Sequence, residues 1–282
     1  MAIHFENIKE HIGSSVSWDD RADLFTPEAA KAIRAKVAER TVLVFPELNL
    51  TDEEQLAITN AIGPKMRLTN TTNVQSNDED VYQVTLDEKI NPQPEYVLGT
   101  FFWHMDGITV DTPPPFATLL SCRIAPDKGG QTEFASTYAA YEGLPEEEKQ
   151  ALEGLKAEHS VKASLSPIAD AIPEKHRERV LGIGLVKEHP VVWTHDDGRK
   201  SMVIGTTADH IVGMDIPAGR AMLVRLQEWA AQPAFSLRHK WKKGDFVIWD
   251  NTGAMHRAVP YEKSTGRMMH RTSIAGTEAV AA

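Results

Sequence analysis

Cysteine is almost absent from this chain of 282 residues, because Cys122 is the only one. A single cysteine can form neither an intrachain disulfide nor a cluster of thiolate metal ligands. Cys122 lies in an apolar, strand-like run, and the chain contains no Gly-x-Ser-x-Gly elbow that would expose a nucleophilic serine. The sequence therefore offers no good candidate for nucleophilic catalysis. A reducing cytoplasm is the expected location.

Positive charge and long apolar runs are also scarce. The formal net charge is −10, whereas nucleic acids and anionic membranes call for a basic surface. No apolar run is long enough to span a bilayer, and the first residues lack a basic stretch followed by an apolar core. Gly129-Gly130 lacks the lysine and hydroxyl residue of a phosphate loop and predicts a tight turn. We therefore expect neither a nucleic-acid nor a membrane partner.

The composition is that of a globular protein, with 41% hydrophobic and 25% charged residues and no repeat or linker, so residues 1–282 are expected to form a single domain. The order of elements is mixed α and β. The helical patterns are those that begin at Thr26-Pro27, at the capping box Thr51-Asp-Glu-Glu54, at Pro145 and at Pro217. The strand patterns cover residues 41–45, 235–241, 246–249 and 265–275. Residues 69–77, together with the segment up to Val97, are expected to form a mobile lid, and residues 163–179 an irregular, flexible segment.

The most informative residues that are present are His104 and Asp106, in the stretch Trp103-His-Met-Asp106. In an extended segment, residues i and i+2 point to the same side, so an imidazole and a carboxylate can converge on one ion. With a second histidine they would form a 2-His-1-carboxylate triad, which leaves positions open on the metal and is typical of non-haem Fe(II) oxygenases. A His-x-Asp pair alone is a weak signal, since it also occurs in hydrogen-bonded surface turns.

The second histidine is expected to be His256. It follows the strand pattern of residues 246–249 and the turn residues 250–253, and it opens another extended piece that ends at Pro260. Of the 11 histidines, His239 is the strongest rival, although it lies within a regular alternating strand. His159, His189 and His239 are more simply read as core histidines that are satisfied by hydrogen bonds.

Two arginines follow His256, in Arg267-Met-Met-His-Arg271. On a strand, Arg267 and Arg271 share one face, and buried unpaired charge is costly unless each cation meets an anion. Their Cα atoms would lie roughly 13 Å apart, so they would serve two different anions. The alternative is an outward-facing basic strand.

These motifs together resemble the Fe(II)/2-oxoglutarate-dependent dioxygenases of the taurine dioxygenase and 2,4-D dioxygenase family. The resemblance covers nearly the whole chain, and its motifs occur in the family's order. They are Thr41-Val-Leu-Val-Phe-Pro46, Trp103-His-Met-Asp106, Gly129-Gly-Gln-Thr132, His189-Pro-Val-Val192, Trp249-Asp-Asn251, His256 and Met269-His-Arg271. It implies a double-stranded β-helix, a jelly-roll barrel with a mainly β core, flanking helices and a long insertion at about residues 107–255.

The resemblance also implies roles for single residues. His104, Asp106 and His256 match the iron ligands. Arg267 and Thr132 match the residues that hold the distal carboxylate of 2-oxoglutarate, whereas Arg271 matches an arginine near the anionic group of the substrate. The implied cofactors are Fe(II), 2-oxoglutarate and O2. The implied reaction is hydroxylation of a small organic acid, with release of succinate and CO2, and the implied assembly is a homo-oligomer, from dimer to tetramer.

Two departures from taurine dioxygenase bear on the substrate. Thr100 stands where that enzyme has an asparagine, and Ala208 where it has an aromatic substrate contact. Both changes leave room for a bulkier or more apolar body, such as an aryloxy or alkyl chain, on a carboxylate or sulfonate. Two other classes stay open from the residues alone. A zinc hydrolase could use the same three ligands with a bound water, and a non-catalytic jelly roll could bind a small acid.

Overall fold

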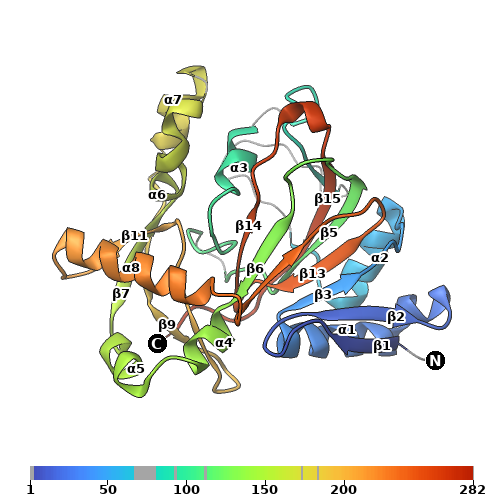
Figure 1. Cartoon of the computed structure of the whole chain (residues 1–282), viewed down its shortest axis with the longest axis horizontal. Coiled ribbons are helices and arrows are strands. Elements are labelled where there is room, and N and C mark those ends of the chain that lie inside the picture. Colours follow the sequence, from blue (N-terminus) through green and yellow to red (C-terminus); the bar gives the residue numbers. More distant parts are fainter. Residues whose placement is uncertain are drawn as a thin grey trace.

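The computed structural model describes residues 3–66, 81–91, 94–110, 113–172, 174–182 and 184–281. Of the predicted lid, residues 69–80 and 92–93 lie outside these ranges. The chain is mixed α and β and rich in sheet, as the sequence predicts (Figure 1). No helix in the described ranges is long and apolar enough to cross a membrane.

The largest sheet has seven strands in the order β1-β2-β3-β13-β5-β15-β4. Its central pairs are antiparallel, β13 with β3 and β5, and β15 with β5. The strands are β1 (Ile3–Asn7), β2 (Ser14–Trp18), β3 (Val42–Phe45), β4 (Tyr82–Val84), β5 (Ala117–Ile124), β13 (Phe246–Asp250) and β15 (Met268–Ile274). The predicted strands at 41–45 and 246–249 are therefore confirmed as β3 and β13.

Two helices cover the outer face of this sheet, α1 (Pro27–Arg40) and α2 (Asp52–Ile62), with the short helix η1 (Arg21–Phe25) beside them. The capping box at Thr51 is formed as the sequence predicts, since its hydroxyl accepts from the Glu54 amide while the Glu54 carboxylate accepts from the Thr51 amide. A continuous apolar core lies between sheet and helices, and it includes Ile33, Val37, Leu119, Ile248 and Ile274.

A second sheet faces the inner side of the first. It has the order β12-β6-β14, formed by β6 (Thr132–Ser136), β12 (Ser236–His239) and β14 (Ala254–Ala258). Side chains of both sheets meet in one core cluster, among them Leu120 and Met269 from the first sheet and Phe134 and Ala254 from the second. In the part of the chain that the structure describes, strand pairing does not join the two sheets into one closed barrel.

The segment between Asp106 and His256 contributes β5, β6, β12 and β13 to these sheets and carries most of a further layer, drawn on the left of Figure 1. That layer contains the sheet β11-β7-β8 and the pair β10-β9. Its elements are α4 (Thr137–Glu142), α5 (Glu146–Leu152), β7 (Lys156–Ser160), α6 (Val161–Leu165), η2 (Ser166–Ala171), α7 (Glu174–Leu181), β8 (Val186–Pro190), β9 (Val192–Thr194), β10 (Lys200–Met202), β11 (Ala208–Ile211) and α8 (Ile216–Ala230). The two remaining short helices are α3 (Pro94–Gly99) and η3 (Lys263–Thr265).

Two local expectations were wrong. Residues 163–171 and 174–179 are helical rather than irregular, because α6, η2 and α7 bury Leu165 and Ile172 against one another. His256 does not open an extended piece; it lies in the middle of β14, paired with Phe134. The strand predicted for residues 265–275 is shorter than expected, and its register shifts between Met268 and Met269.

Candidate metal centre

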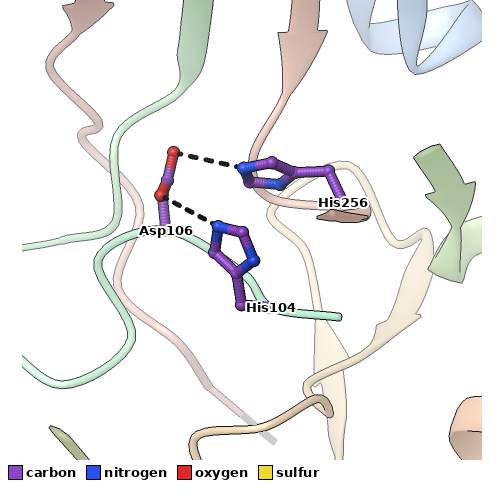
Figure 2. Close-up of side chains that lie close together, drawn as sticks. All are labelled: His104, Asp106 and His256. Carbon is purple, nitrogen blue, oxygen red and sulfur yellow. Dashed lines mark ion pairs between the residues drawn. The ribbon is translucent and has the colours of Figure 1, made fainter. Parts of the chain in front are cut away.

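His104, Asp106 and His256 converge on one point, although His256 is far from the other two along the chain (Figure 2). His104 Nε2 lies 4.0 Å from one carboxylate oxygen of Asp106, and His256 Nε2 lies 3.8 Å from the other. One ligand atom from each residue lies within 4.8 Å of the others. Two imidazole nitrogens and one carboxylate oxygen on one side of a point are the donor set of a facial triad.

The backbone fixes the distance between the two histidines. His104 donates its amide hydrogen to the His256 carbonyl at 3.1 Å, and His256 donates to the His104 carbonyl at 2.9 Å. A reciprocal pair of this kind is the hydrogen-bonded pair of an antiparallel ladder, in which the two side chains lie on the same face. The segment that carries His104 thus lies along β14, and the ring centroids of the two histidines are 4.2 Å apart.

Both imidazoles are set up as neutral ligands. His104 Nδ1 lies 2.8 Å from the Phe102 carbonyl, so Nδ1 carries the hydrogen and Nε2 keeps its lone pair toward Asp106. Burial lowers the pKa of His104. Burial, with a further contribution from the neighbouring His104, holds the pKa of His256 well below its ordinary value. The ring of His256 packs against the rings of Trp249 and Phe134.

Asp106 is held from the opposite sheet. Thr118 on β5 donates its hydroxyl hydrogen to Asp106 Oδ2 at 3.0 Å, and Asn251 in turn donates to the Thr118 oxygen at 2.9 Å. Arg271 on β15 donates to the same Asp106 oxygen at 2.7 Å. Burial alone would raise the pKa of Asp106, but the Arg271 guanidinium and the two histidines hold it below its ordinary value. The carboxylate is therefore ionised, and its Oδ1 accepts no hydrogen bond from the described residues.

Arg271 is therefore found next to a metal ligand. The sequence predicts that it meets a second anion, and in the structure the anion that it meets is Asp106. One donor is still unused, because the Nε of Arg271 is buried and has no hydrogen-bond partner in the described part of the chain. A role of Arg271 toward a substrate stays a prediction.

Arg267 lies deep in the same space, just outside β15, and only 3% of its surface is exposed. Its Nε donates to the Gly130 carbonyl at 3.1 Å, and its guanidinium lies over the Tyr261 ring. Within the described residues no carboxylate comes within ion-pair distance of Arg267. Burial lowers the pKa of this guanidinium, which is the physical sign of a cation that lacks a counter-ion.

Thr132 follows the turn at Gly129-Gly130, both of which have positive φ, as the predicted tight turn requires. A side chain at Gly130 would meet the Arg267 side chain at 3.0 Å, so this glycine lets the two segments approach. The Thr132 oxygen accepts from Trp241 Nε1 at 2.9 Å. Its hydroxyl hydrogen is therefore free for another acceptor.

The two residues predicted to contact substrate lie near the His104 segment. Thr100 donates its hydroxyl hydrogen to the Val97 carbonyl at 2.7 Å, while its own carbonyl accepts from Ala258 on β14. Ala208 begins β11 and lines a cavity together with Phe102 and Trp103. The structure thus brings both residues to the segment next to the metal centre, without testing what they bind.

Sequence reasoning missed the loop before Ala208. The Thr206 amide donates to the Trp103 carbonyl at 2.7 Å. At Gly205, which has φ +115, a Cβ would meet the Trp103 carbonyl oxygen at 2.9 Å and His104 Cα at 3.2 Å. The loop therefore presses against the backbone of the first ligand. Thr118 and Trp241 were also missed. Thr118 contacts Asp106 and Trp241 contacts Thr132 only because distant segments meet in the fold, which no local sequence pattern marks.

The rival histidine has another partner. His239 Nε2 lies 3.0 Å from Asp245, which also accepts from the Lys242 amide. The hydrogen bonds predicted for the other core histidines are present too, from His159 to Thr207 and from His189 to the Ile108 carbonyl. His256 is thus the histidine that the fold brings to His104 and Asp106.

Comparison with known proteins agrees with this geometry. The family model "Taurine catabolism dioxygenase TauD, TfdA family" matches residues 4–273. The chain belongs to this family.

Three similar proteins show the range of the TauD/TfdA family. The alpha-ketoglutarate-dependent 2,4-dichlorophenoxyacetate dioxygenase of Burkholderia sp. (strain RASC) is 32% identical over 89% of this chain and 87% of its own length. The alpha-ketoglutarate-dependent sulfate ester dioxygenase of Pseudomonas putida is 34% identical over 62% of this chain and 59% of its own. The crystal structure of AAD-2 in complex with Mn(II) and N-oxalylglycine superposes with a TM-score of 0.81 at 30% identity and covers 100% of both chains.

Proposed function

We propose that this protein is an Fe(II)- and 2-oxoglutarate-dependent dioxygenase that hydroxylates a small organic acid. The observation that carries the proposal is the combination of two features in the interior of the protein. These are the triad of His104, Asp106 and His256, and the buried cation Arg267, which lacks an acidic partner in the described residues. A metal site alone is common to many classes, whereas a metal site beside an uncompensated buried arginine calls for an anionic cosubstrate.

The triad residues fit Fe(II). Two neutral imidazoles and one ionised carboxylate supply three donors, and a six-coordinate ion would keep three positions for exogenous ligands. The histidines need no deprotonation before they bind, because burial keeps the pKa of each imidazole low. The carboxylate needs none either, because the pKa of Asp106 is also held low. Bound iron together with 2-oxoglutarate supplies O2 activation coupled to release of succinate and CO2.

Arg267 and Thr132 would hold the distal carboxylate of 2-oxoglutarate. A guanidinium can bind a carboxylate through two parallel N–H donors; among the described residues, the Nε of Arg267 donates to Gly130 and the guanidinium lies over Tyr261, without an acidic partner. The free hydroxyl hydrogen of Thr132 adds a third donor, while Trp241 fixes the position of its oxygen. The buried setting excludes water and strengthens each of these contacts.

Arg271 would hold the anionic group of the substrate. With Asp106 acting as a metal ligand, Arg271 would pair with its carboxylate less strongly. The unused Nε of Arg271 could then donate to a substrate carboxylate or sulfonate. The named relatives act on a phenoxyacetate and on a sulfate ester, which are anionic substrates.

The proposal extends to architecture. We take the two facing sheets to be the halves of the family's jelly roll, which the likeness to AAD-2 supports. Residues 1–282 would then form one catalytic domain, and the stretch of about 107–255 would contain the insertion together with four strands of the two sheets. The chain would assemble as a dimer to tetramer.

Anaerobic titration with Fe(II) and then 2-oxoglutarate tests the reaction class. The dioxygenase should develop a metal-to-ligand charge-transfer band in the visible, which neither a zinc hydrolase nor a non-catalytic binding protein would give. Admission of O2 should then release succinate, faster with a productive acid than without one. If no band appears at saturating iron and 2-oxoglutarate, the proposed function is wrong.

A further inference from the structure

Tyr261 lies against Arg267 in the interior of the protein. Only 8% of its surface is exposed, and the Arg267 guanidinium lies over its ring, 4.9 Å from the centroid. An aromatic face attracts a cation, and the attraction is stronger where water is excluded. Tyr261 is therefore part of the immediate surroundings of the buried cation that has no acidic partner in the described residues.

The backbone brings Tyr261 next to the turn at Gly129-Gly130. Val259 accepts from the Gly130 amide at 2.9 Å, and its own amide donates to the Gln131 carbonyl at 2.7 Å. These two hydrogen bonds continue the pairing of β6 with β14 toward Tyr261. A Cβ at Gly129 would meet Tyr261 Cα at 3.2 Å, so the glycine permits the close approach. The same turn therefore places both Arg267 and Tyr261, because the Gly130 carbonyl accepts from Arg267.

The hydroxyl of Tyr261 is a donor that lacks an acceptor. It is buried, and no hydrogen bond of good geometry joins it to the described residues. Burial raises the pKa of Tyr261, and the neighbouring Arg267 offsets only part of the rise, so the hydroxyl stays protonated. A guanidinium has donors and no acceptor, so Arg267 can donate to the hydroxyl oxygen but cannot accept its hydrogen. The hydroxyl hydrogen thus requires an acceptor from outside the described residues.

Packing explains the ring of Tyr261 but not its hydroxyl. The ring belongs to a small apolar cluster with Leu86 and Val97, and it meets the Phe101 ring edge-on at 5.5 Å. A phenylalanine would fill the same cluster and would bury no unsatisfied donor, which costs stability. The hydroxyl therefore indicates a function beyond packing.

Three groups in this region need the same kind of partner. The Arg267 guanidinium lacks an anion, and the Tyr261 hydroxyl hydrogen lacks an acceptor. The Thr132 hydroxyl hydrogen is free as well, because its oxygen accepts from Trp241. An ionised carboxylate has about four lone-pair sites and can accept from all three donors at once. A charged acceptor would also compensate the buried cation.

We propose that Tyr261 is a specificity-determining residue of the cosubstrate pocket, where its hydroxyl donates to the distal carboxylate of 2-oxoglutarate and its ring supports Arg267. The proposal rests on the proposed function, which assigns Arg267 and Thr132 to the same carboxylate. Tyr261 adds a third group, and the three together select a 2-oxo acid that carries a distal carboxylate over one that does not.

Two probes that differ by one group test this selection, 2-oxoglutarate and 2-oxopentanoate. Both have the same chain length and the same 2-oxo acid end, but only 2-oxoglutarate has the distal carboxylate. Each is titrated calorimetrically into the anaerobic protein loaded with Fe(II), and the visible charge-transfer band is recorded in parallel. The wild-type protein should bind 2-oxoglutarate on the order of 100-fold more tightly, because 2-oxopentanoate leaves a buried cation unpaired.

Three variants assign part of this preference to Tyr261. Tyr261→Phe should weaken 2-oxoglutarate about tenfold, since a hydrogen bond to a charged group is lost, and should change 2-oxopentanoate less than about twofold. Tyr261→Leu removes the ring as well and should weaken 2-oxoglutarate further. The matched control is Tyr138→Phe, which removes a hydroxyl from a tyrosine that is 5% exposed and whose partner is Thr252 at 2.8 Å. It should keep the wild-type affinity for both probes.

The two probes separate a contact with the carboxylate from a defect in packing. Equal weakening of both probes in Tyr261→Phe would overturn the proposal, and so would an unchanged affinity for 2-oxoglutarate. A wild-type protein that binds 2-oxoglutarate without developing the band would overturn the proposed function instead, while the calorimetric comparison of the two probes would still decide the role of Tyr261. Absence of any 2-oxoglutarate binding would overturn both.

Discussion

Two clusters in this protein satisfy the same geometric condition for a metal site, and they differ in almost everything else. In each, three ligand atoms lie within 4.8 Å of one another. The first is the triad of His104, Asp106 and His256. The second consists of Glu158, Asp209 and His210 on the β7 and β11 strands of the insertion. Proximity alone would rank the two clusters equally.

Two of the three side chains in the second cluster are already bonded to neighbours. Asp209 accepts from Arg220 through one oxygen and faces His210 Nδ1 at 2.9 Å through the other. These two contacts, after the opposing effect of burial, hold the pKa of Asp209 below its ordinary value. In the triad, by contrast, Asp106 Oδ1 and both imidazole Nε2 atoms form no hydrogen bond with the described residues. A set of converging side chains indicates a metal site only when its lone pairs are not already bonded to neighbours.

The largest expected effect comes from removing a triad histidine. His256→Ala should abolish turnover and reduce Fe(II) affinity by at least 100-fold, because one of three protein ligands is lost. His239→Ala should retain both, since His239 contacts Asp245. Fe(II) titration and succinate release measure the two quantities. Full activity in His256→Ala would show that another residue completes the site.

The cations near the two clusters differ in the same way. Arg220 is paired with Asp209, whereas Arg267 has no acidic partner in the described residues. Arg267→Ala should therefore weaken 2-oxoglutarate on the order of 100-fold, the cost of losing one partner of a buried charge pair. Arg267→Lys should recover part of this, because lysine keeps the charge but lacks the planar fork. Arg220→Ala is the matched control, and an unchanged 2-oxoglutarate affinity in Arg267→Ala would refute the assignment.

A smaller effect is expected from the loop that presses on the first ligand. Gly205 and Gly198 both have positive φ, so an alanine at either should cost roughly 1–2 kcal/mol of stability. Only at Gly205 would the new Cβ meet the backbone of Trp103 and His104. We expect Gly205→Ala to weaken Fe(II) about tenfold, or about 1.4 kcal/mol, and Gly198→Ala to leave metal affinity unchanged. Equal metal affinities in the two variants would show that the loop does not position His104.

Acidification should have the smallest effect. A lowered pKa favours the neutral imidazole, which is the form that binds metal, so His104 and His256 should remain competent as the pH falls through the ordinary histidine range. Metal affinity should change less than about twofold between about pH 7.5 and 6.0, whereas two imidazoles of ordinary pKa would lose about tenfold. Metal titration at the two pH values decides between these expectations.

The sequence predicted the parts of this structure that depend on local pattern. The helix caps at Thr26 and Thr51, the buried strand at residues 246–249 and the closeness of His104 to Asp106 all follow from neighbours along the chain. Contacts between distant segments could not be read in this way. The pairing of Arg271 with Asp106 depends on how β15 lies beside β5, which no local pattern specifies. The helices of residues 161–181 escaped prediction because a few contacts such as Leu165 with Ile172 stabilise short segments.

Metal stoichiometry tests the contrast between the two clusters most directly. Fe(II) is titrated anaerobically into the wild-type protein, Asp106→Ala and Asp209→Ala, and bound metal is counted per chain. The account predicts about one tightly bound ion in the wild-type protein and in Asp209→Ala, and none in Asp106→Ala. Retention of the ion in Asp106→Ala together with its loss in Asp209→Ala would contradict the account, because it would place the metal in the insertion.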